Sequence, residues 1–275
     1  MSAKQAELPP VMILCGGQGT RLRDLTELLP KPMVPIGEQP VLWHIMRGFA
    51  AFGCRRFILC LGYKREEFID YFLNFQARSC DMTITLGRKN GIVYHGSSAE
   101  ADWEVTLADT GIDTMTGGRV LRASRYLKPQ DREFFLTYGD GVADIDVAAL
   151  LEFHRRNGKQ LTVSAVHPEG RFGEMQLDDR GGIIGFTEKK VRSEGRVNGG
   201  FMVLERDFVA RYLERREDCY FEQRPMAEAL RDGEMAAYRH EGFWQCMDTP
   251  REHRILNELW ESGNAPWCRF WQEGE

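Results

Sequence analysis

The sequence predicts an α/β protein with a doubly wound, mixed but mostly parallel sheet and a smaller appended β-sheet. In the first half of the chain, wholly apolar runs of about five residues alternate with segments of helical periodicity, which is the pattern of buried parallel strands and their crossover helices. In the second half, the shorter runs EMQL, IIGF and VNGGFMVL are separated by turn residues, which indicates the smaller mixed sheet.

The length and composition fit one large soluble domain. A chain of 275 residues can bury a complete α/β core, and 43% hydrophobic with 28% charged residues is typical of soluble globular proteins. No apolar run approaches the ~20 residues of a membrane-spanning helix, and the opening MSAKQAELPP lacks the apolar core of a signal peptide. We therefore expect a cytoplasmic protein without a membrane partner.

The charge and the patterns of cysteine and histidine argue against several functional classes. A formal net charge of −5 gives no broad basic surface for nucleic acid, so an anionic ligand would be bound by a local group of arginines and lysines. The seven cysteines form no CxxC pair and the six histidines form no HxxxH or HExxH motif, which argues against a disulfide framework and a zinc site. The chain also lacks the G-x-S-x-G motif of serine hydrolases.

The first predicted strand, Val11–Cys15, runs directly into the glycine-rich loop GGQG at 16–19. Glycines let the backbone approach a ligand closely, and the loop amides can point at phosphate oxygens. Arg21 adds a forked positive charge, and Lys31 adds a second one on a segment stiffened by a proline on either side. This grouping suits a nucleoside triphosphate. It is neither a Walker loop, which needs GxxxxGK[ST], nor the dinucleotide fingerprint, which needs a glycine where Leu22 stands.

The remaining elements alternate as a doubly wound fold requires. Expected helices cover 40–52, 64–75, a segment from Thr116 onward, 150–157 and 250–261, and expected strands cover 57–61, 104–108, 133–138 and 161–167. The segment 81–96 alternates only weakly and is either a two-stranded ribbon or a mobile loop. Arg122 and Arg125 follow at three-residue spacing in the helix from Thr116 and are expected on a solvated face.

Two aspartates are candidate metal ligands. Asp140 follows the strand 133–138 in the turn GDG, and in open α/β sheets ligands bind at the carboxyl ends of strands. Asp248 lies in FWQCMDT, 108 residues later. Each has a competing structural role, because an aspartate suits a GDG turn and Asp-Thr-Pro also suits the start of the helix 250–261. The sequence alone does not show whether the two carboxylates meet.

The loop GGQGTRL followed by PKPM resembles the sugar-1-phosphate nucleotidyltransferases. The segments VLWHIM, DTGIDTMTGGR, TYGDGVAD, VNGGF, GFWQCMDT and APW are similar to those of the glucose-1-phosphate cytidylyltransferase family, and the resemblance extends from Val11 to Trp267. It implies a Rossmann-like nucleotidyltransferase fold in which a sugar 1-phosphate, most simply α-D-glucose 1-phosphate, attacks the α-phosphorus of CTP and releases pyrophosphate. It also implies Mg2+, a homo-oligomer like the hexamers of that family, and a role in sugar nucleotide supply for lipopolysaccharide O-antigen.

The resemblance assigns roles to individual residues. It implies catalytic roles for Arg21, Lys31 and Lys189, and metal ligation by Asp140 and Asp248. The implied substrate contacts are Leu14, Cys15, Gly16, Gly17, Gln18, Gly19, Thr20, Arg21, Lys31, Thr114, Arg119, Gly139, Glu188, Lys189 and Asn198. It also divides a single domain, 1–275, into a nucleotide-binding half, 11–168, and a half that holds the sugar phosphate and ends in the C-terminal helix, 169–275.

Some positions depart from the family pattern and leave alternatives open. Lys190 replaces the proline of the usual EKP and Glu174 stands where small apolar residues are common, so the sugar is not fixed. Cys246 replaces another proline of the family pattern. Arg119 can donate to O2 of cytosine or uracil alike, so the choice of CTP over UTP rests on the resemblance. A regulatory paralogue that binds a sugar nucleotide without turnover stays an alternative, although it would be expected to have lost part of the charged set. A dinucleotide dehydrogenase is disfavoured by Leu22.

Overall fold

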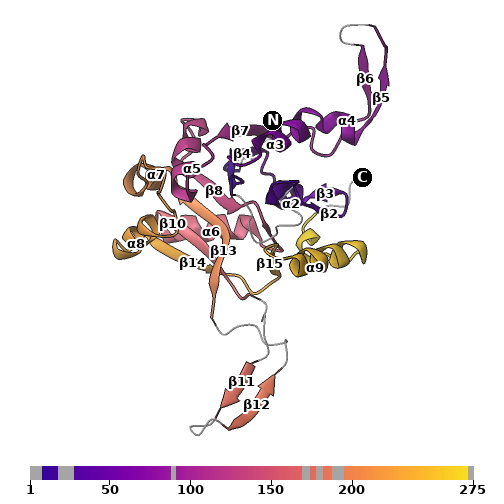
Figure 1. Cartoon of the computed structure of the whole chain (residues 1–275). Coiled ribbons are helices and arrows are strands. Elements are labelled where there is room, and N and C mark those ends of the chain that lie inside the picture. Colours follow the sequence, from indigo (N-terminus) through magenta and orange to yellow (C-terminus); the bar gives the residue numbers. More distant parts are fainter. Residues whose placement is uncertain are drawn as a thin grey trace, which may run out of the picture.

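The computed structural model describes residues 8–17, 28–87, 91–168, 174–177, 182–187 and 195–271, with the backbone alone in 174–177 and most of 182–187. Its centre is a seven-stranded sheet in the order β14-β10-β13-β8-β1-β4-β7 (Figure 1). The strands are β1 (Val11–Leu14), β4 (Arg56–Leu61), β7 (Glu104–Asp109), β8 (Glu133–Tyr138), β10 (Leu161–Val166), β13 (Val197–Glu205) and β14 (Met235–Arg239). Within this sheet β13 runs antiparallel to both of its neighbours, and the other pairs are parallel. The predicted mixed, mostly parallel sheet is confirmed.

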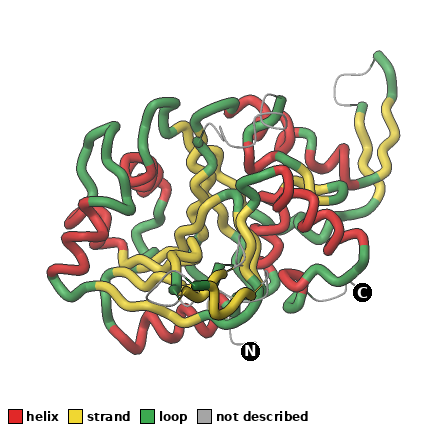
Figure 2. Tube along the Cα trace, turned by 60° about the horizontal axis from the view of Figure 1, so that its bottom comes forward, coloured by secondary structure: helices red, strands yellow, loops and turns green. Residues whose placement is uncertain are grey.

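Helices cover both faces of the sheet (Figure 2). One face carries α2 (Val41–Ala50), α3 (Arg65–Leu73), α6 (Val147–Asn157) and α9 (Pro250–Glu261), and the other carries α5 (Thr116–Ala123), α7 (Arg206–Tyr212) and α8 (Arg224–Arg231). Within β1, Val11 and Ile13 belong to the first core, whereas Met12 and Leu14 belong to the second. Because both faces are buried, the strand is apolar at every position, which is why it could be recognised in the sequence.

The predicted helix over 64–75 is interrupted at Asn74. There α3 ends and α4 (Phe75–Ser79) begins. The side-chain amide of Asn74 donates to the backbone oxygen of Asp70 at 2.9 Å, and such local bonds to the backbone compete with a continuous helix. The other predicted strands, and the helices whose two ends were predicted, are present, with ends shifted by at most three residues.

In the described part of the chain, four two-stranded antiparallel sheets accompany the central one. They pair β2 (Pro35–Ile36) with β3 (Gln39–Pro40), β5 (Asp81–Ile84) with β6 (Ile92–His95), β9 (Gly141–Ala143) with β15 (Trp244–Cys246), and β11 (Glu174–Leu177) with β12 (Ile183–Thr187). The β5–β6 and β11–β12 pairs project from the body of the molecule (Figure 1). The described strands of segment 81–96, which the sequence left open between a ribbon and a loop, therefore form a ribbon.

The prediction that VNGGFMVL belongs to the smaller sheet is wrong. This segment is β13, which lies inside the central sheet between β10 and β8. Its residues from Gly199 to Leu204 are all buried, as a strand with neighbours on both edges and helices on both faces requires. The turns on either side hid this in the sequence, because a short run between turns looks the same in a central or an appended sheet. EMQL and IIGF do form the appended pair, β11–β12.

Two expectations about the whole chain can be compared with the structure. All seven cysteines are unpaired thiols, in agreement with the absence of a disulfide framework, and four of them are buried. None of the described helices is long and apolar enough to cross a membrane.

Candidate active site

A cavity of about 530 Å³ opens at the carboxyl ends of β1 and β8. Ten predicted site residues line it: Leu14, Cys15, Gly16, Gly17, Lys31, Thr114, Arg119, Gly139, Asp140 and Asp248. Parallel strands end at the same edge of a sheet, which explains why residues so distant in sequence meet there. The predicted residues Gln18, Gly19, Thr20, Arg21, Glu188 and Lys189 lie outside the described residues.

The floor of the cavity is tightly packed backbone. The Gly139 amide donates to the Leu14 carbonyl at 3.1 Å, which joins the ends of β8 and β1. A Cβ at Gly139 would lie 2.9 Å from Cγ of Pro32 and 3.1 Å from that same carbonyl oxygen. Glycine is therefore required here for a close approach of three segments, and Pro32 is a lining residue that the sequence analysis did not identify.

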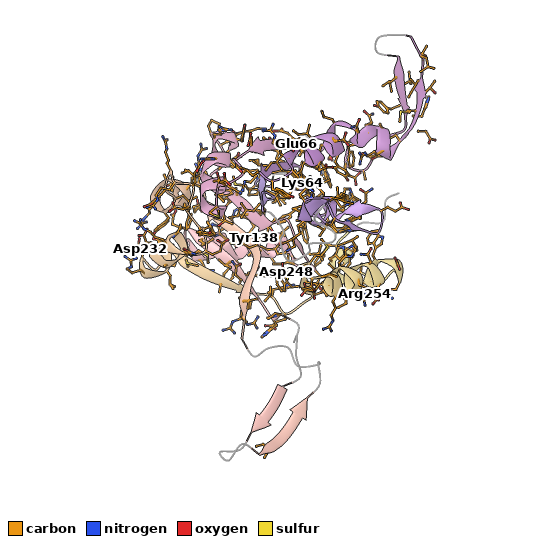
Figure 3. All side chains as sticks on the ribbon, in the orientation of Figure 1. Lys64, Glu66, Tyr138, Asp232, Asp248 and Arg254 are labelled. Atoms are coloured by element: carbon orange, nitrogen blue, oxygen red, sulfur yellow. The ribbon has the colours of Figure 1, made fainter. Side chains whose placement is uncertain are left out.

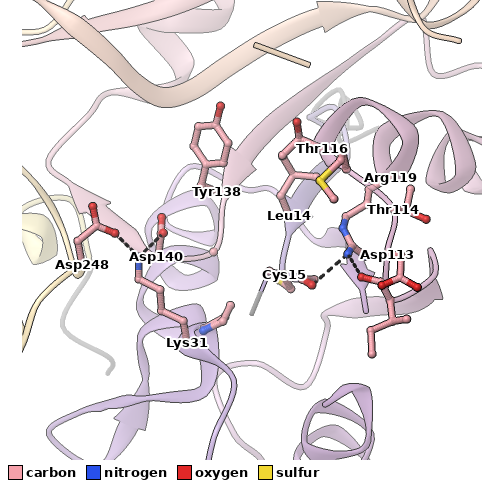
Figure 4. A pocket seen from close by; sticks show the side chains of 16 residues that line it. Leu14, Cys15, Lys31, Asp113, Thr114, Thr116, Arg119, Tyr138, Asp140 and Asp248 are labelled. Carbon is pink, nitrogen blue, oxygen red and sulfur yellow. Dashed lines mark hydrogen bonds and ion pairs between the residues drawn. The ribbon is translucent and has the colours of Figure 1, made fainter. Parts of the chain in front are cut away.

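Lys31 joins the two candidate metal ligands. Its Nζ lies 2.6 Å from Oδ2 of Asp140 and 2.5 Å from Oδ1 of Asp248 (Figure 4). Lys31 belongs to the short 3-10 helix η2 (Lys31–Met33), which follows Pro30. Burial by itself lowers the pKa of Lys31, but the two carboxylates outweigh it and the pKa lies above its ordinary value. The ammonium is thus charged at any physiological pH.

The topology brings the two aspartates together although they are far apart in sequence. β9 and β15 pair with Gly141 opposite Cys246, and the Met247 amide donates to the Asp140 carbonyl at 2.8 Å. Asp248 is not the N-cap of α9, because Thr249 caps this helix in a capping box with Glu252. In the view of all side chains, Asp248 lies near the middle of the molecule, close to Tyr138 (Figure 3).

The arrangement of Asp140 and Asp248 fits a divalent cation. Two carboxylate oxygens converge on one point of positive charge, the Lys31 ammonium, and carboxylate oxygens are the protein ligands that Mg2+ prefers. The site borders a cavity large enough for a nucleotide, so substrate phosphates can complete the coordination.

Arg119 is held inside the cavity wall. Its side chain is almost fully buried, and Nη1 donates to the Leu61 carbonyl at 3.0 Å and to the Gly111 carbonyl at 2.7 Å. Nη2 donates to the Gly16 carbonyl at 3.0 Å and the Ile112 carbonyl at 3.1 Å. Burial lowers the pKa of Arg119. Arg119 therefore ties the start of the glycine loop to the segment after β7, a role that the sequence did not reveal.

Arg122 in α5 and Arg125 in the 3-10 helix η3 (Ser124–Tyr126) are both exposed, as predicted, although α5 itself ends at Ala123. Arg122 nevertheless supports the cavity, because its Nη1 donates to Oγ1 of the buried lining residue Thr114 at 2.6 Å. Its Nη2 pairs with Glu217 at 3.1 Å.

A hydrogen-bonded group around Tyr138 closes another side of the cavity. The Tyr138 hydroxyl donates to Glu222 at 2.5 Å, and the Thr116 hydroxyl donates to the other oxygen of the same carboxylate at 2.7 Å. Asn198 Nδ2 lies 3.5 Å from the Tyr138 hydroxyl, so this predicted residue contacts a lining residue. Burial and the nearby Glu222 raise the pKa of Tyr138. None of Tyr138, Thr116 and Glu222 was predicted, although Tyr138 stands directly before the GDG turn.

Comparisons with known proteins agree with this geometry. The family model described as nucleotidyl transferase matches residues 10–249. The chain is 42% identical to the glucose-1-phosphate cytidylyltransferases of Salmonella typhi, over 95% of this chain and 99% of the relative, and of Salmonella typhimurium, over the same shares. Among solved structures, HddC from Yersinia pseudotuberculosis has a TM-score of 0.64 at 22% identity, covering 92% of this chain and all of that one, and HddC complexed with GMP-PN has a TM-score of 0.62. The chain therefore belongs to the nucleotidyl transferase family and, within it, to the glucose-1-phosphate cytidylyltransferases.

Proposed function

We propose that this enzyme transfers the cytidylyl group of CTP to a sugar 1-phosphate, most simply α-D-glucose 1-phosphate, and releases CDP-glucose and pyrophosphate. The observation that carries the proposal is the convergence of Lys31, Asp140 and Asp248 at a cavity whose wall begins with the glycine loop after β1. The choice of CTP and glucose 1-phosphate as substrates rests on the relatives named for this reaction, which are 42% identical over 95% of this chain.

The chemistry needs positioning and charge neutralisation rather than a general base. The attacking phosphate oxygen is already ionised at neutral pH, and none of the described residues that line the cavity is a histidine. Asp140 and Asp248 would hold Mg2+, which supplies neutralisation of the triphosphate charge. Lys31, fixed on a short helical turn, would donate to the reacting phosphates. We assign the departing pyrophosphate to Arg21 and the loop 16–20, and the sugar phosphate to Glu188 and Lys189.

The cytosine base is assigned to the wall formed by the glycine loop and the segment around Thr114. Arg119 holds these two segments against each other through the Gly16 and Ile112 carbonyls, so it would shape the base site in addition to any donation to O2 of the ring. The sugar is assigned to the side that carries Asn198, which contacts Tyr138. These assignments follow the proposed division of the domain into a nucleotide half, 11–168, and a sugar-phosphate half, 169–275.

We further propose a cytoplasmic homo-oligomer, a hexamer like those of the family it resembles, that supplies sugar nucleotide for lipopolysaccharide O-antigen. The support for the oligomer is the projecting β5–β6 ribbon. Met82, Ile84 and Ile92 are 38%, 54% and 48% exposed there, and an isolated two-stranded ribbon is only marginally stable in water. A partner chain would bury these side chains.

A matrix of nucleoside triphosphates against sugar 1-phosphates, measured by pyrophosphate release, tests the function. We expect the highest kcat/KM for CTP with glucose 1-phosphate, weaker use of UTP and poor use of purine triphosphates. If dTTP or ATP exceeds CTP with glucose 1-phosphate, the cytidylyl assignment fails and only the nucleotidyl transferase family remains.

A variant series separates an enzyme from a paralogue that only binds the product. Asp140→Ala and Asp248→Ala should each abolish Mg2+-dependent turnover and leave a folded protein, because each removes a metal ligand without removing core volume. A wild-type protein that binds CDP-glucose and releases no pyrophosphate with any pair of substrates would support the regulatory alternative.

A further inference from the structure

A second group of ligating side chains lies at the opposite end of β8 from the active site. Glu133 begins β8 and Glu205 ends β13, and the two residues are directly paired in the sheet. His154 reaches them from α6. Because β8 extends from Glu133 to Tyr138, a rise of ~3.3 Å per residue separates this group from the cavity by roughly 17 Å. The group is therefore independent of the carboxylates at Lys31.

The imidazole of His154 is buried and only half satisfied. Its side chain is 1% exposed, and Nδ1 lies 2.8 Å from the hydroxyl oxygen of Thr162. Nε2 lies 3.3 Å from Oε1 of Glu205, yet among the described residues it has no hydrogen bond of acceptable geometry. Buried polar nitrogens seldom lack a hydrogen-bond partner, so a ligand bound at Nε2 would explain this arrangement.

The surrounding atoms offer a coordination set. One ligand atom each from Glu133, His154 and Glu205 lies within 4.8 Å of the other two. Bonds of ~2.0–2.2 Å to a common ion would draw these atoms closer together, and the partly exposed Glu205 side chain has room to rotate. Arg155 donates to Oε1 of Glu133, which leaves Oε2 of that carboxylate for an ion.

We propose that Glu133, His154 and Glu205 form a structural binding site for a divalent transition-metal ion, with Zn2+ as the best match. An imidazole nitrogen with two carboxylate oxygens is a ligand set that Zn2+ accepts, whereas Mg2+ prefers oxygen alone. The Thr162 hydroxyl at Nδ1 would fix the orientation of the ring, as groups behind a metal-bound histidine commonly do. No short spacing motif signals this site, because the three residues come from three separate elements.

The site would link α6 to two strands of the central sheet. β8 and β13 both lead to the active-site region at their other ends, through Tyr138 and Asn198. An ion that binds only the folded state raises the free energy of unfolding, and the increase grows with the logarithm of the ratio of ion concentration to Kd. We therefore expect Zn2+ to raise the Tm by several degrees without taking part in cytidylyl transfer.

The test measures Zn2+ binding with the active-site metal ligand removed. Full-length Asp140→Asn protein, freed of metal with a chelator, should bind one equivalent of Zn2+ in equilibrium dialysis with excess Mg2+, and its Tm should rise. Adding Glu205→Gln should weaken Zn2+ binding at least ~10-fold, because one ligand is lost with little change in shape. Adding Glu241→Gln instead is the matched control, since the exposed Glu241 pairs with the partly buried His167 at 3.6 Å and with Arg196, away from this group, and should leave the affinity unchanged.

Two results would overturn the proposal. One is a Zn2+ affinity that Glu205→Gln leaves unaltered, which would mean that His154 and Glu205 contact each other without binding a metal ion. The other is an equal loss in the Glu241→Gln control, which would indicate general binding at the surface. Should the Glu205→Gln protein fold poorly, Co2+ substitution in the Asp140→Asn protein gives a second readout. Imidazole-coordinated Co2+ absorbs differently from Co2+ in water, and a spectrum identical to that in water would also reject the site.

Discussion

The Lys31 ammonium contacts two carboxylates at the centre of the candidate active site. Lys31 is 12% exposed at its side chain, and Asp140 and Asp248 are 32% and 20% exposed. Removing one member of a group of partly buried, mutually paired charges is costly. Lys31, Asp140 and Asp248 thus form ion pairs in the resting protein, and the proposed reaction uses the same three residues.

We expect Lys31→Ala to lower kcat by roughly 10²-fold or more, the scale seen when one preorganised electrostatic contact to a transition state is removed. Lys128→Ala is the matched control, because Lys128 pairs with Glu104 at 3.2 Å on the surface, away from the cavity. Pyrophosphate release per folded molecule measures the effect. A loss of thermal stability with unchanged turnover would make Lys31 a structural residue only.

The buried imidazole of His44 should make the fold sensitive to acid. Nε2 of His44 lies 2.9 Å from the Ile36 carbonyl, and Nδ1 accepts from the Trp267 indole at 3.3 Å, so the ring is held neutral. Burial lowers its pKa to about 4. The unfolded chain gains a proton near pH 6.5 and the folded protein only near pH 4, so stability is lost as the pH falls through this window.

Between pH 7.5 and pH 5, this residue should cost the wild-type protein about 2 kcal/mol of unfolding free energy, from the two pKa values. Urea unfolding at both pH values measures the loss. His44→Gln should show a correspondingly smaller loss, whereas His253→Gln, which removes a partly buried histidine of α9, should retain the wild-type slope. Equal slopes for the wild type and His44→Gln would contradict the assignment.

The start of α9 holds the proposed metal ligand Asp248 in place. The Thr249 hydroxyl accepts from the Glu252 amide at 3.3 Å, and the Glu252 carboxylate accepts from the amides of Asp248 and Thr249 at 2.7 and 2.9 Å. The capping box therefore fixes the backbone of Asp248 as well as the helix end.

We expect Thr249→Ala to reduce the unfolding free energy by about 1 kcal/mol, the usual cost of removing an N-cap hydroxyl. Because Asp248 is then held less firmly, a higher Mg2+ concentration should be needed for half-maximal turnover. Denaturant unfolding and a Mg2+ titration measure the two effects. Thr249→Ser keeps the hydroxyl and should restore both, and an alanine variant with wild-type values of both would show that the cap is not required.

The elements that the sequence predicted are those with a local signal. The apolar run of β1, the stiffened PKPM segment and the Thr249-Pro250 helix start each carry their information within a few residues. The position of β13 in the central sheet and the hydrogen bonds of Arg119 were not predicted, because both depend on which distant segments become neighbours. The Tyr138–Glu222 pair, 84 residues apart, was missed for the same reason.

The projecting β5–β6 ribbon carries an apolar face outside the body of the molecule (Figure 1). Met82 pairs with Tyr94 and Ile84 with Ile92, and directly paired residues share a face, so these side chains form one apolar face of the ribbon. Within the described chain this face has no covering element, since Ile84 and Ile92 are about half exposed. A second copy of the chain would remove that apolar area from water.

We therefore expect Ile84→Asp to shift the protein to a smaller oligomer in light scattering coupled to size-exclusion chromatography, because a charge in a buried apolar contact is unfavourable. Leu230→Asp is the matched control, since Leu230 is 68% exposed on α8 and should leave the assembly unchanged. The ribbon is separate from the lining of the active site, so the smaller species should keep pyrophosphate release if each site is complete within one chain. A loss of turnover that parallels dissociation would instead mean that neighbouring chains complete each other's sites, and an unchanged oligomer would exclude the ribbon as the interface.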